Sequence, residues 1–116
     1  MPAPPKLSAD HVTARLRDLP GWAIKGGKLH REFTFPDFVA AFGFMTEAAR
    51  AAEGLEHHPE WFNVWNRVTV DLNTHDAGGL TELDFSLAAR MSELAAAPPH
   101  RRLPDPPAAP DASATP

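Results

Sequence analysis

The placement of proline limits how much of this chain can pack into one folded unit. Of the 13 prolines, three lie within the first five residues, seven lie between Pro98 and Pro116, and only three lie in between. Proline removes a backbone donor and interrupts helices and sheets. We therefore expect disordered ends at residues 1–5 and 98–116 and one folded domain over residues 6–97. A domain of about 90 residues buries a single, thin core.

Charge and composition exclude several classes of function. The net charge is -4, acidic and basic residues are interspersed, and the only basic run is the short His100–Arg102 patch, so no nucleic-acid partner is expected. The chain has no cysteine, and hence no disulfide framework or thiol nucleophile. No signal-like segment opens the chain, and no apolar run approaches the ~18 residues of a membrane span. We predict a cytoplasmic protein without a membrane partner.

The first third of the sequence predicts a helix and a hairpin. Ser8 is a suitable N-cap for a helix that continues to Leu19. Apolar and polar residues alternate over residues 22–25 and again over residues 28–35. Gly26–Gly27 lies between these two segments and suits the positive φ angles of a tight hairpin turn.

A long helix is predicted over residues 36–53. Pro36 suits the first helical position, Asp37 favours the positive helix N-terminus, and Gly54 is a good C-terminal glycine. One apolar stripe of this helix is wider than a single sheet face requires, and we expect part of it to contact another subunit. Its members are Phe38, Phe42, Met45, Ala49 and Ala52, with Phe44, Ala48 and Ala51 beside them.

The remaining segment predicts a second hairpin and a last helix. Alternation over residues 62–72 is interrupted by a bend near Asn66–Arg67, and a loop follows over residues 73–79. Thr81 and Asp84 have the spacing of a capping box at the start of the last helix. Short turns within each strand pair favour antiparallel pairing. The predicted fold class is α+β, a two-layer sandwich with helices on one face of an antiparallel sheet.

Several polar residues have spacings that suit acid/base chemistry. Glu53 precedes His57 by four residues, which would place both side chains on one helix face. A carboxylate beside an imidazole sets its tautomer and raises its basicity, and histidine exchanges protons near neutral pH. His58 is adjacent, and His75 follows the second hairpin close to Asp84. A site for general acid/base catalysis is therefore predicted at Glu53, His57, His58 and His75.

Structural explanations of the same residues stay open. Asp84 has a sufficient role as a helix-capping residue, and Glu53 as a polar residue of a last helical turn. Trp61 and Trp65 bracket the second hairpin, where they either pack in the ordinary way or form a stacking wall for a flat ring. The remaining histidines are expected to be solvated.

A metal site is the main rival interpretation of the histidines. His57, His58 and His75 with Glu53 are numerous enough for zinc. Adjacent histidines point apart, however, and the chain contains no His-Glu-x-x-His run. We predict no metal.

One block of sequence resembles a known family. The string Glu53-Gly-Leu-Glu-His-His-Pro-Glu-Trp-Phe-Asn-Val64, with Thr74–His75 and Asp84 downstream, closely resembles the pterin-4a-carbinolamine dehydratases. The resemblance extends over most of residues 22–94 and leaves the proline-rich ends outside. It implies a four-stranded antiparallel sheet and a homodimer or homotetramer, here through the helix at residues 36–53.

The resemblance also implies a reaction and roles. Members remove water from 4a-hydroxytetrahydropterin to give quinonoid dihydropterin, in tetrahydrobiopterin recycling, without a metal or organic cofactor. On this basis His57 and His75 form the acid/base pair, and His58 orients the pterin. Glu53 holds His57. Trp61 and Asp84 complete the substrate-binding site.

A non-enzymatic function is the alternative on the same fold. Some relatives of this family act as a binding partner of a transcription factor or as an assembly factor. Assembly factors are expected to have lost the active-site histidines, whereas Glu53, His57, His58 and His75 are all present in this chain. The sequence therefore favours retained catalysis.

Overall fold

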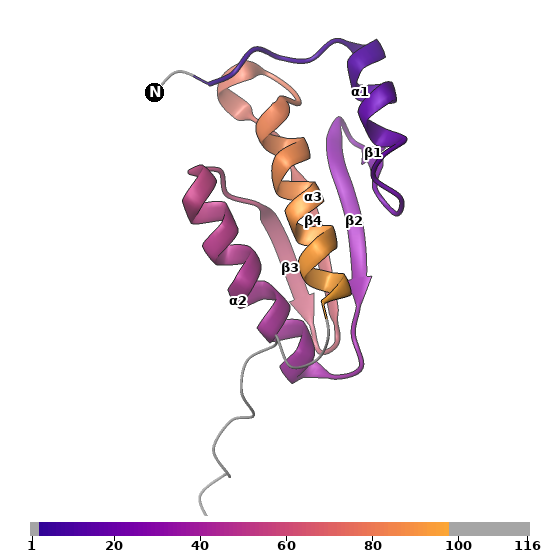
Figure 1. The fold of residues 1–116 in the computed structure, drawn as a ribbon, viewed down its shortest axis with the longest axis vertical. Coiled ribbons are helices and arrows are strands. Elements are labelled where there is room, and N and C mark those ends of the chain that lie inside the picture. Colours follow the sequence, from indigo (N-terminus) through magenta and orange to yellow (C-terminus); the bar gives the residue numbers. More distant parts are fainter. Residues whose placement is uncertain (1–2, 98–116) are drawn as a thin grey trace, which may run out of the picture.

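The order of helices and strands agrees with the sequence-based prediction. The computed structural model describes residues 3–97 (Figure 1). The elements are α1 (Ala9–Leu16), β1 (Ala23–Lys25), β2 (Lys28–Thr34), α2 (Phe38–Leu55), β3 (Glu60–Val64), β4 (Arg67–Leu72), a 3-10 turn η1 (His75–Ala77) and α3 (Glu82–Ala96). The predicted tail at residues 98–116 and the first two residues lie outside the described part of the chain.

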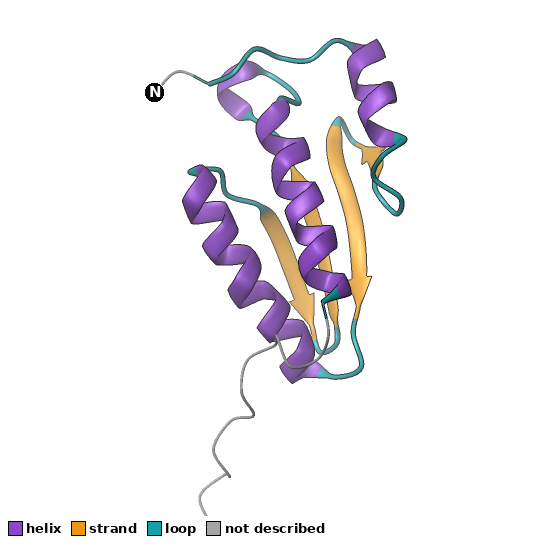
Figure 2. Ribbon diagram, in the orientation of Figure 1, coloured by secondary structure: helices purple, strands orange, loops and turns teal. Residues whose placement is uncertain are grey.

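The four strands form one antiparallel sheet in the order β1-β2-β4-β3. Its helices all lie over one face, as Figure 2 shows, which confirms the predicted two-layer α+β class. Gly26 and Gly27 make the first hairpin turn with φ of 59° and 78°, a conformation that glycine adopts without steric cost. The second hairpin reverses at Trp65–Asn66, one residue earlier than predicted.

The core lies between the sheet and the two long helices. Val68, Val70 and Leu72 of β4 point toward the helices, because alternate residues of a strand face the same side. The strand β2 contributes Leu29 and Phe33 to the same core, opposite Leu72 and Val68 of β4. The α3 residues that meet them are Phe85, Leu87, Ala88 and Met91, all fully buried.

The alternating apolar residues of β3 face away from this core. Phe62 pairs with Thr69 on the open face of the sheet and is 68% exposed. Trp61 pairs with Val70 and therefore lies on the helix-covered face. Alternation identified the strand correctly, but the burial of its two faces depends on what the helices cover.

Three predicted helix boundaries are wrong by two or three residues. The first helix ends at Leu16 rather than Leu19, and a turn follows. The long helix begins at Phe38 rather than Pro36, because the Asp37 side chain accepts the amide of Ala40 as an N-cap. Gly54 is helical, and the left-handed C-cap is Glu56 with φ of 50°.

The face of α2 that packs on the core is narrower than its apolar surface. Ala41, Phe44, Ala48 and Ala52 are buried, whereas Phe38 and Phe42 are 45% and 47% exposed. Small alanines let α2 approach the sheet closely. Phe38 and Phe42 are left on the outer side of the helix.

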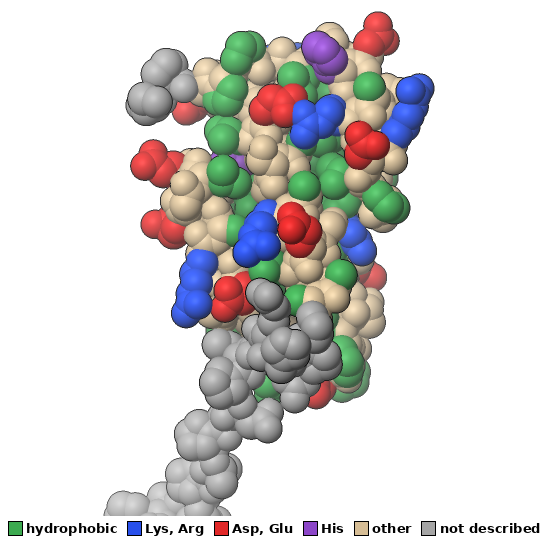
Figure 3. Space-filling model, in the orientation of Figure 1, with side chains coloured by type: hydrophobic (Ala, Val, Ile, Leu, Met, Phe, Trp, Pro, Cys, Tyr) green, Lys and Arg blue, Asp and Glu red, His purple; other side chains and the backbone are tan. Residues whose placement is uncertain are grey.

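The surface over the helices carries no large patch of one charge. Acidic and basic side chains alternate across this face in Figure 3. Among residues 3–97, no helix has the length and apolar character needed to cross a membrane.

The cross-strand pair Leu29–Ile24 tests the assignment of the core. Leu29 is fully buried, and its partner Ile24 is 42% exposed. We expect Leu29→Ala to lower the free energy of unfolding by about 2–5 kcal/mol. Ile24→Ala should cost less than half as much, as measured by urea denaturation. Equal losses would contradict this description of the core.

Candidate active site

The second hairpin brings the predicted site segments to one end of the sheet. Glu60 at the start of β3 pairs with Asp71 near the end of β4. His57 and His58 lie just before β3, separated from it by Pro59, and His75 follows β4. Antiparallel pairing therefore places the three histidines at the same edge of the fold.

Asp84 is the buried centre of this region. One carboxylate oxygen, Oδ1, accepts a hydrogen bond from His57 Nε2 at 2.6 Å. The other, Oδ2, accepts from the Thr74 hydroxyl at 2.8 Å and from the Thr81 backbone amide at 2.9 Å. Asp84 is fully buried and His57 is 8% exposed. The same carboxylate thus completes the predicted capping box and holds a histidine.

Glu53 holds a different histidine from the predicted one. Its Oε1 lies 2.5 Å from Nε2 of His58, and His57 pairs with Asp84 instead. The predicted i to i+4 spacing requires a helix through His57. The helix ends at Leu55, and the left-handed Glu56 turns the chain, which directs the His57 ring inward.

His75 is the most exposed of the three rings and lies beside a carboxylate that the sequence analysis missed. Its Nε2 lies 3.5 Å from Oε2 of Glu60. The other oxygen, Oε1, accepts from Nζ of Lys28 at 2.6 Å. The hydrogen bond from Lys28 lowers the pKa of Glu60, with a smaller contribution from His75. Glu60 directly follows His57-His58-Pro59 in the sequence, and this position next to the histidines could have indicated that it belongs to the site.

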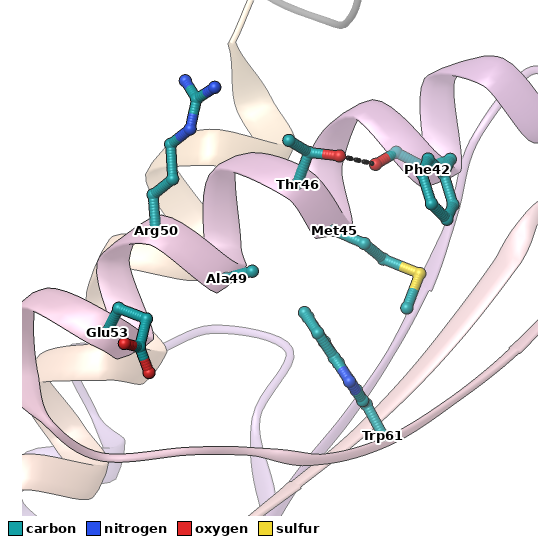
Figure 4. Close-up of a pocket in the computed structure, with 7 residues that line it drawn as sticks. All are labelled: Phe42, Met45, Thr46, Ala49, Arg50, Glu53 and Trp61. Atoms are coloured by element: carbon teal, nitrogen blue, oxygen red, sulfur yellow. Dashed lines mark hydrogen bonds between the residues drawn. The ribbon is translucent and has the colours of Figure 1, made fainter.

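An apolar groove lies next to the Glu53–His58 pair. It has a volume of about 570 Å³, in the range of small-ligand sites. Trp61 of β3 forms one wall opposite Met45 and Ala49 of α2, and Glu53 lies at one end (Figure 4). The other lining residues are Phe42, Thr46 and Arg50. Trp65 lies in the hairpin turn, 64% exposed, and does not line the groove.

The site therefore contains three imidazoles, each facing its own carboxylate through Nε2. His57 pairs with Asp84, His58 with Glu53 and His75 with Glu60. An ionised carboxylate only accepts hydrogen bonds, so a proton on Nε2 satisfies both partners at His57 and at His58, where the contacts are 2.6 and 2.5 Å. Within residues 3–97, no three potential metal-binding side chains come close enough together to hold an ion.

Fold and site define a small α+β protein with a histidine–carboxylate centre. The family model described as pterin 4 alpha carbinolamine dehydratase matches residues 5–94. The chain belongs to this family.

Individual relatives agree with the family match. A Solibacter usitatus protein is 58% identical over 91 residues, covering 78% of this chain and 96% of its own. A Rhizobium johnstonii protein is 59% identical over 93 residues, covering 78% and 92%. Both carry the provisional name pterin-4-alpha-carbinolamine dehydratase. The crystal structure of a transcriptional coactivator/pterin dehydratase from Brucella melitensis is similar, with a TM-score of 0.75 and 48% identity over 78% of this chain and 98% of that one.

The two carboxylates next to His57 and His58 should differ in their effect on stability. Asp84→Asn places an amide where three donors converge, and we expect a loss of about 1–3 kcal/mol in the free energy of unfolding. Glu53→Gln alters a pair whose side chains are 76% and 65% exposed, so its effect should stay within about 0.5 kcal/mol. Denaturant unfolding of the two variants measures the difference. A larger loss for Glu53→Gln would contradict the burial described for Asp84.

Proposed function

We propose that this protein is a pterin-4a-carbinolamine dehydratase that removes water from 4a-hydroxytetrahydropterin by general acid/base catalysis. The main supporting observation is the group of three carboxylate-paired imidazoles at one end of the second hairpin. Family membership and the names of the relatives support the same reaction. We further propose that the substrate enters from the groove beside Trp61, whose ring offers a flat surface for stacking a pterin.

The reaction needs two proton transfers. The C4a–O bond breaks as the departing hydroxyl receives a proton and leaves as water. A proton leaves N5, and its bonding electrons form the C4a=N5 double bond of the quinonoid product. An imidazolium supplies the first proton and a neutral imidazole accepts the second, so two histidines suffice without a redox step.

Each site residue has a proposed role. One member of the pair His57 and His75 donates the proton to the departing hydroxyl, and the other accepts the proton from N5. His58 binds and orients the pterin. Asp84 holds His57, and Glu53 holds His58 rather than His57. These carboxylates lower the cost of orienting each ring before the substrate binds.

The direct test is the rate of dehydration of 4a-hydroxytetrahydropterin by the purified full-length chain. Each general acid or base typically contributes ~10²–10⁴-fold, so His57→Ala and His75→Ala should each lower turnover at least about tenfold. The control is His11→Ala, an exposed histidine at the start of α1, which should keep the wild-type rate. Near-normal rates in both site variants would contradict the assignment.

Failure of the wild-type protein to exceed the spontaneous rate would favour the non-enzymatic alternative. The name of the Brucella melitensis structure combines both classes, a transcriptional coactivator and a pterin dehydratase. Retention of His57, His58 and His75 together with their carboxylates favours the enzyme for this chain. The cytoplasmic location stays a prediction.

We also propose that the outer side of α2 packs against a second copy of this chain. Phe38 and Phe42 lie on this side with ring centroids 5.7 Å apart, and both are nearly half exposed. Contiguous apolar surface of this kind is typical of an interface.

Replacement of these aromatics tests the interface. We expect the wild-type protein to sediment as a dimer or larger, and the Phe38→Ser/Phe42→Ser variant to shift toward the 12.6 kDa monomer. Ile24→Ser, at an exposed apolar residue on β1, is the control and should keep the wild-type mass. A monomeric wild-type protein, or an unchanged mass in the double variant, would overturn the proposal.

A further inference from the structure

The side chain of Glu60 contacts both Lys28 of β2 and His75 of the turn η1. Its backbone lies on the edge strand β3, and its two carboxylate oxygens face different partners. Oε1 accepts from Nζ of Lys28 at 2.6 Å, and Oε2 faces Nε2 of His75 at 3.5 Å. A carboxylate with one oxygen anchored and the other directed at an imidazole can orient that ring.

The sheet holds the anchor in place. Lys28 begins β2, which is separated from β3 by β4, so its side chain crosses the middle strand to reach Glu60. Backbone pairing of Glu60 with Asp71 and of Leu29 with Leu72 holds the three strands in register. Both members of the Lys28–Glu60 pair therefore start from rigid backbone, which reduces the entropy lost on pairing.

His75 has less support of its own than the other two histidines. Its side chain is 79% exposed, against 10% for His57, and it lies in the short turn η1. An exposed imidazole samples both tautomers and several rotamers unless a partner selects one. Glu60 is the partner that the structure provides on the side of Nε2.

We propose that Glu60, anchored by Lys28, is a positioning residue that holds His75 in the Nε2–H tautomer and directs Nδ1 to the substrate. The effect of Glu60 on catalysis rests on the proposed dehydratase function. Its effect on the tautomer of His75 does not. The 3.5 Å separation is longer than an ordinary hydrogen bond, and contacts between catalytic groups commonly shorten when substrate binds.

The first experiment reads the tautomer directly. Long-range ¹H–¹⁵N spectra of the full chain, at a pH where the imidazoles are neutral, distinguish a protonated Nε2 from a protonated Nδ1. The His75 signals are assigned by their loss in His75→Ala. We expect mainly the Nε2–H form in the wild-type protein and a mixture of tautomers in Glu60→Gln.

A matched control separates this effect from a general change of charge. Glu32 is an exposed carboxylate on the same open face of the sheet, opposite Thr69. Glu32→Gln makes the same change of charge away from His75 and should leave the His75 spectrum and the dehydration rate unchanged. Unchanged His75 tautomers in Glu60→Gln would overturn the proposal.

The second experiment measures the consequence for turnover. We expect Glu60→Gln to lower kcat on the order of tenfold with less than about a twofold change in KM, because the ring is misdirected rather than lost. Glu60→Asp, which keeps the charge on a shorter side chain, should recover part of kcat. Wild-type kcat in Glu60→Gln would overturn the catalytic part of the proposal.

A double-mutant cycle tests the anchor. Lys28→Met alone should lower kcat roughly threefold, and it should have no further effect in the Glu60→Gln background, because both changes act through the same contact. Additive losses would overturn the role of Lys28. An inactive wild-type protein would remove the proposed function, and the tautomer spectra would still decide whether Glu60 orients His75.

Discussion

The buried carboxylate of Asp84 is the interaction on which the rest of the site depends. It accepts hydrogen bonds from His57, from the Thr74 side chain and from the backbone of Thr81 at the start of α3. A buried charge is tolerated only when its oxygens are satisfied, and three donors from three segments satisfy them. The same carboxylate therefore caps α3 and orients His57. Through its hydrogen bond with Thr74, it also fixes the start of the loop that carries His75.

The three histidines differ in how firmly the fold holds them. His57 is buried and bound by a buried partner, whereas His58 and His75 are exposed and face exposed glutamates. Proton transfer by an imidazole and hydrogen bonding of an imidazole to a substrate both require the ring to be held in one orientation. The fold meets this requirement with carboxylates from three elements: α3 supplies Asp84, α2 supplies Glu53 and β3 supplies Glu60. We regard this division of supporting groups among the elements as the physical basis of the proposed reaction.

The helix α2 serves two sides of the molecule. Its small residues, such as Ala41 and Ala48, let it lie close to the sheet. Its larger apolar residues, such as Phe38 and Met45, face outward or line the groove. The width of its apolar stripe was visible in the sequence. The residues of this stripe that become buried depend on the angle at which the helix packs on the sheet. The periodicity of the sequence does not predict that angle.

The sequence by itself determined the order of elements, the Gly26–Gly27 turn and the capping box at Thr81, because each follows from local backbone chemistry and from periodicity. It also predicted that His57, His58 and His75 belong to one site. Only the tertiary structure decided their partners. His57 pairs with Asp84 rather than Glu53, since the left-handed Glu56 turns the chain away from the helix face. Glu60 reaches His75 through strand pairing, a long-range contact that linear spacing does not record.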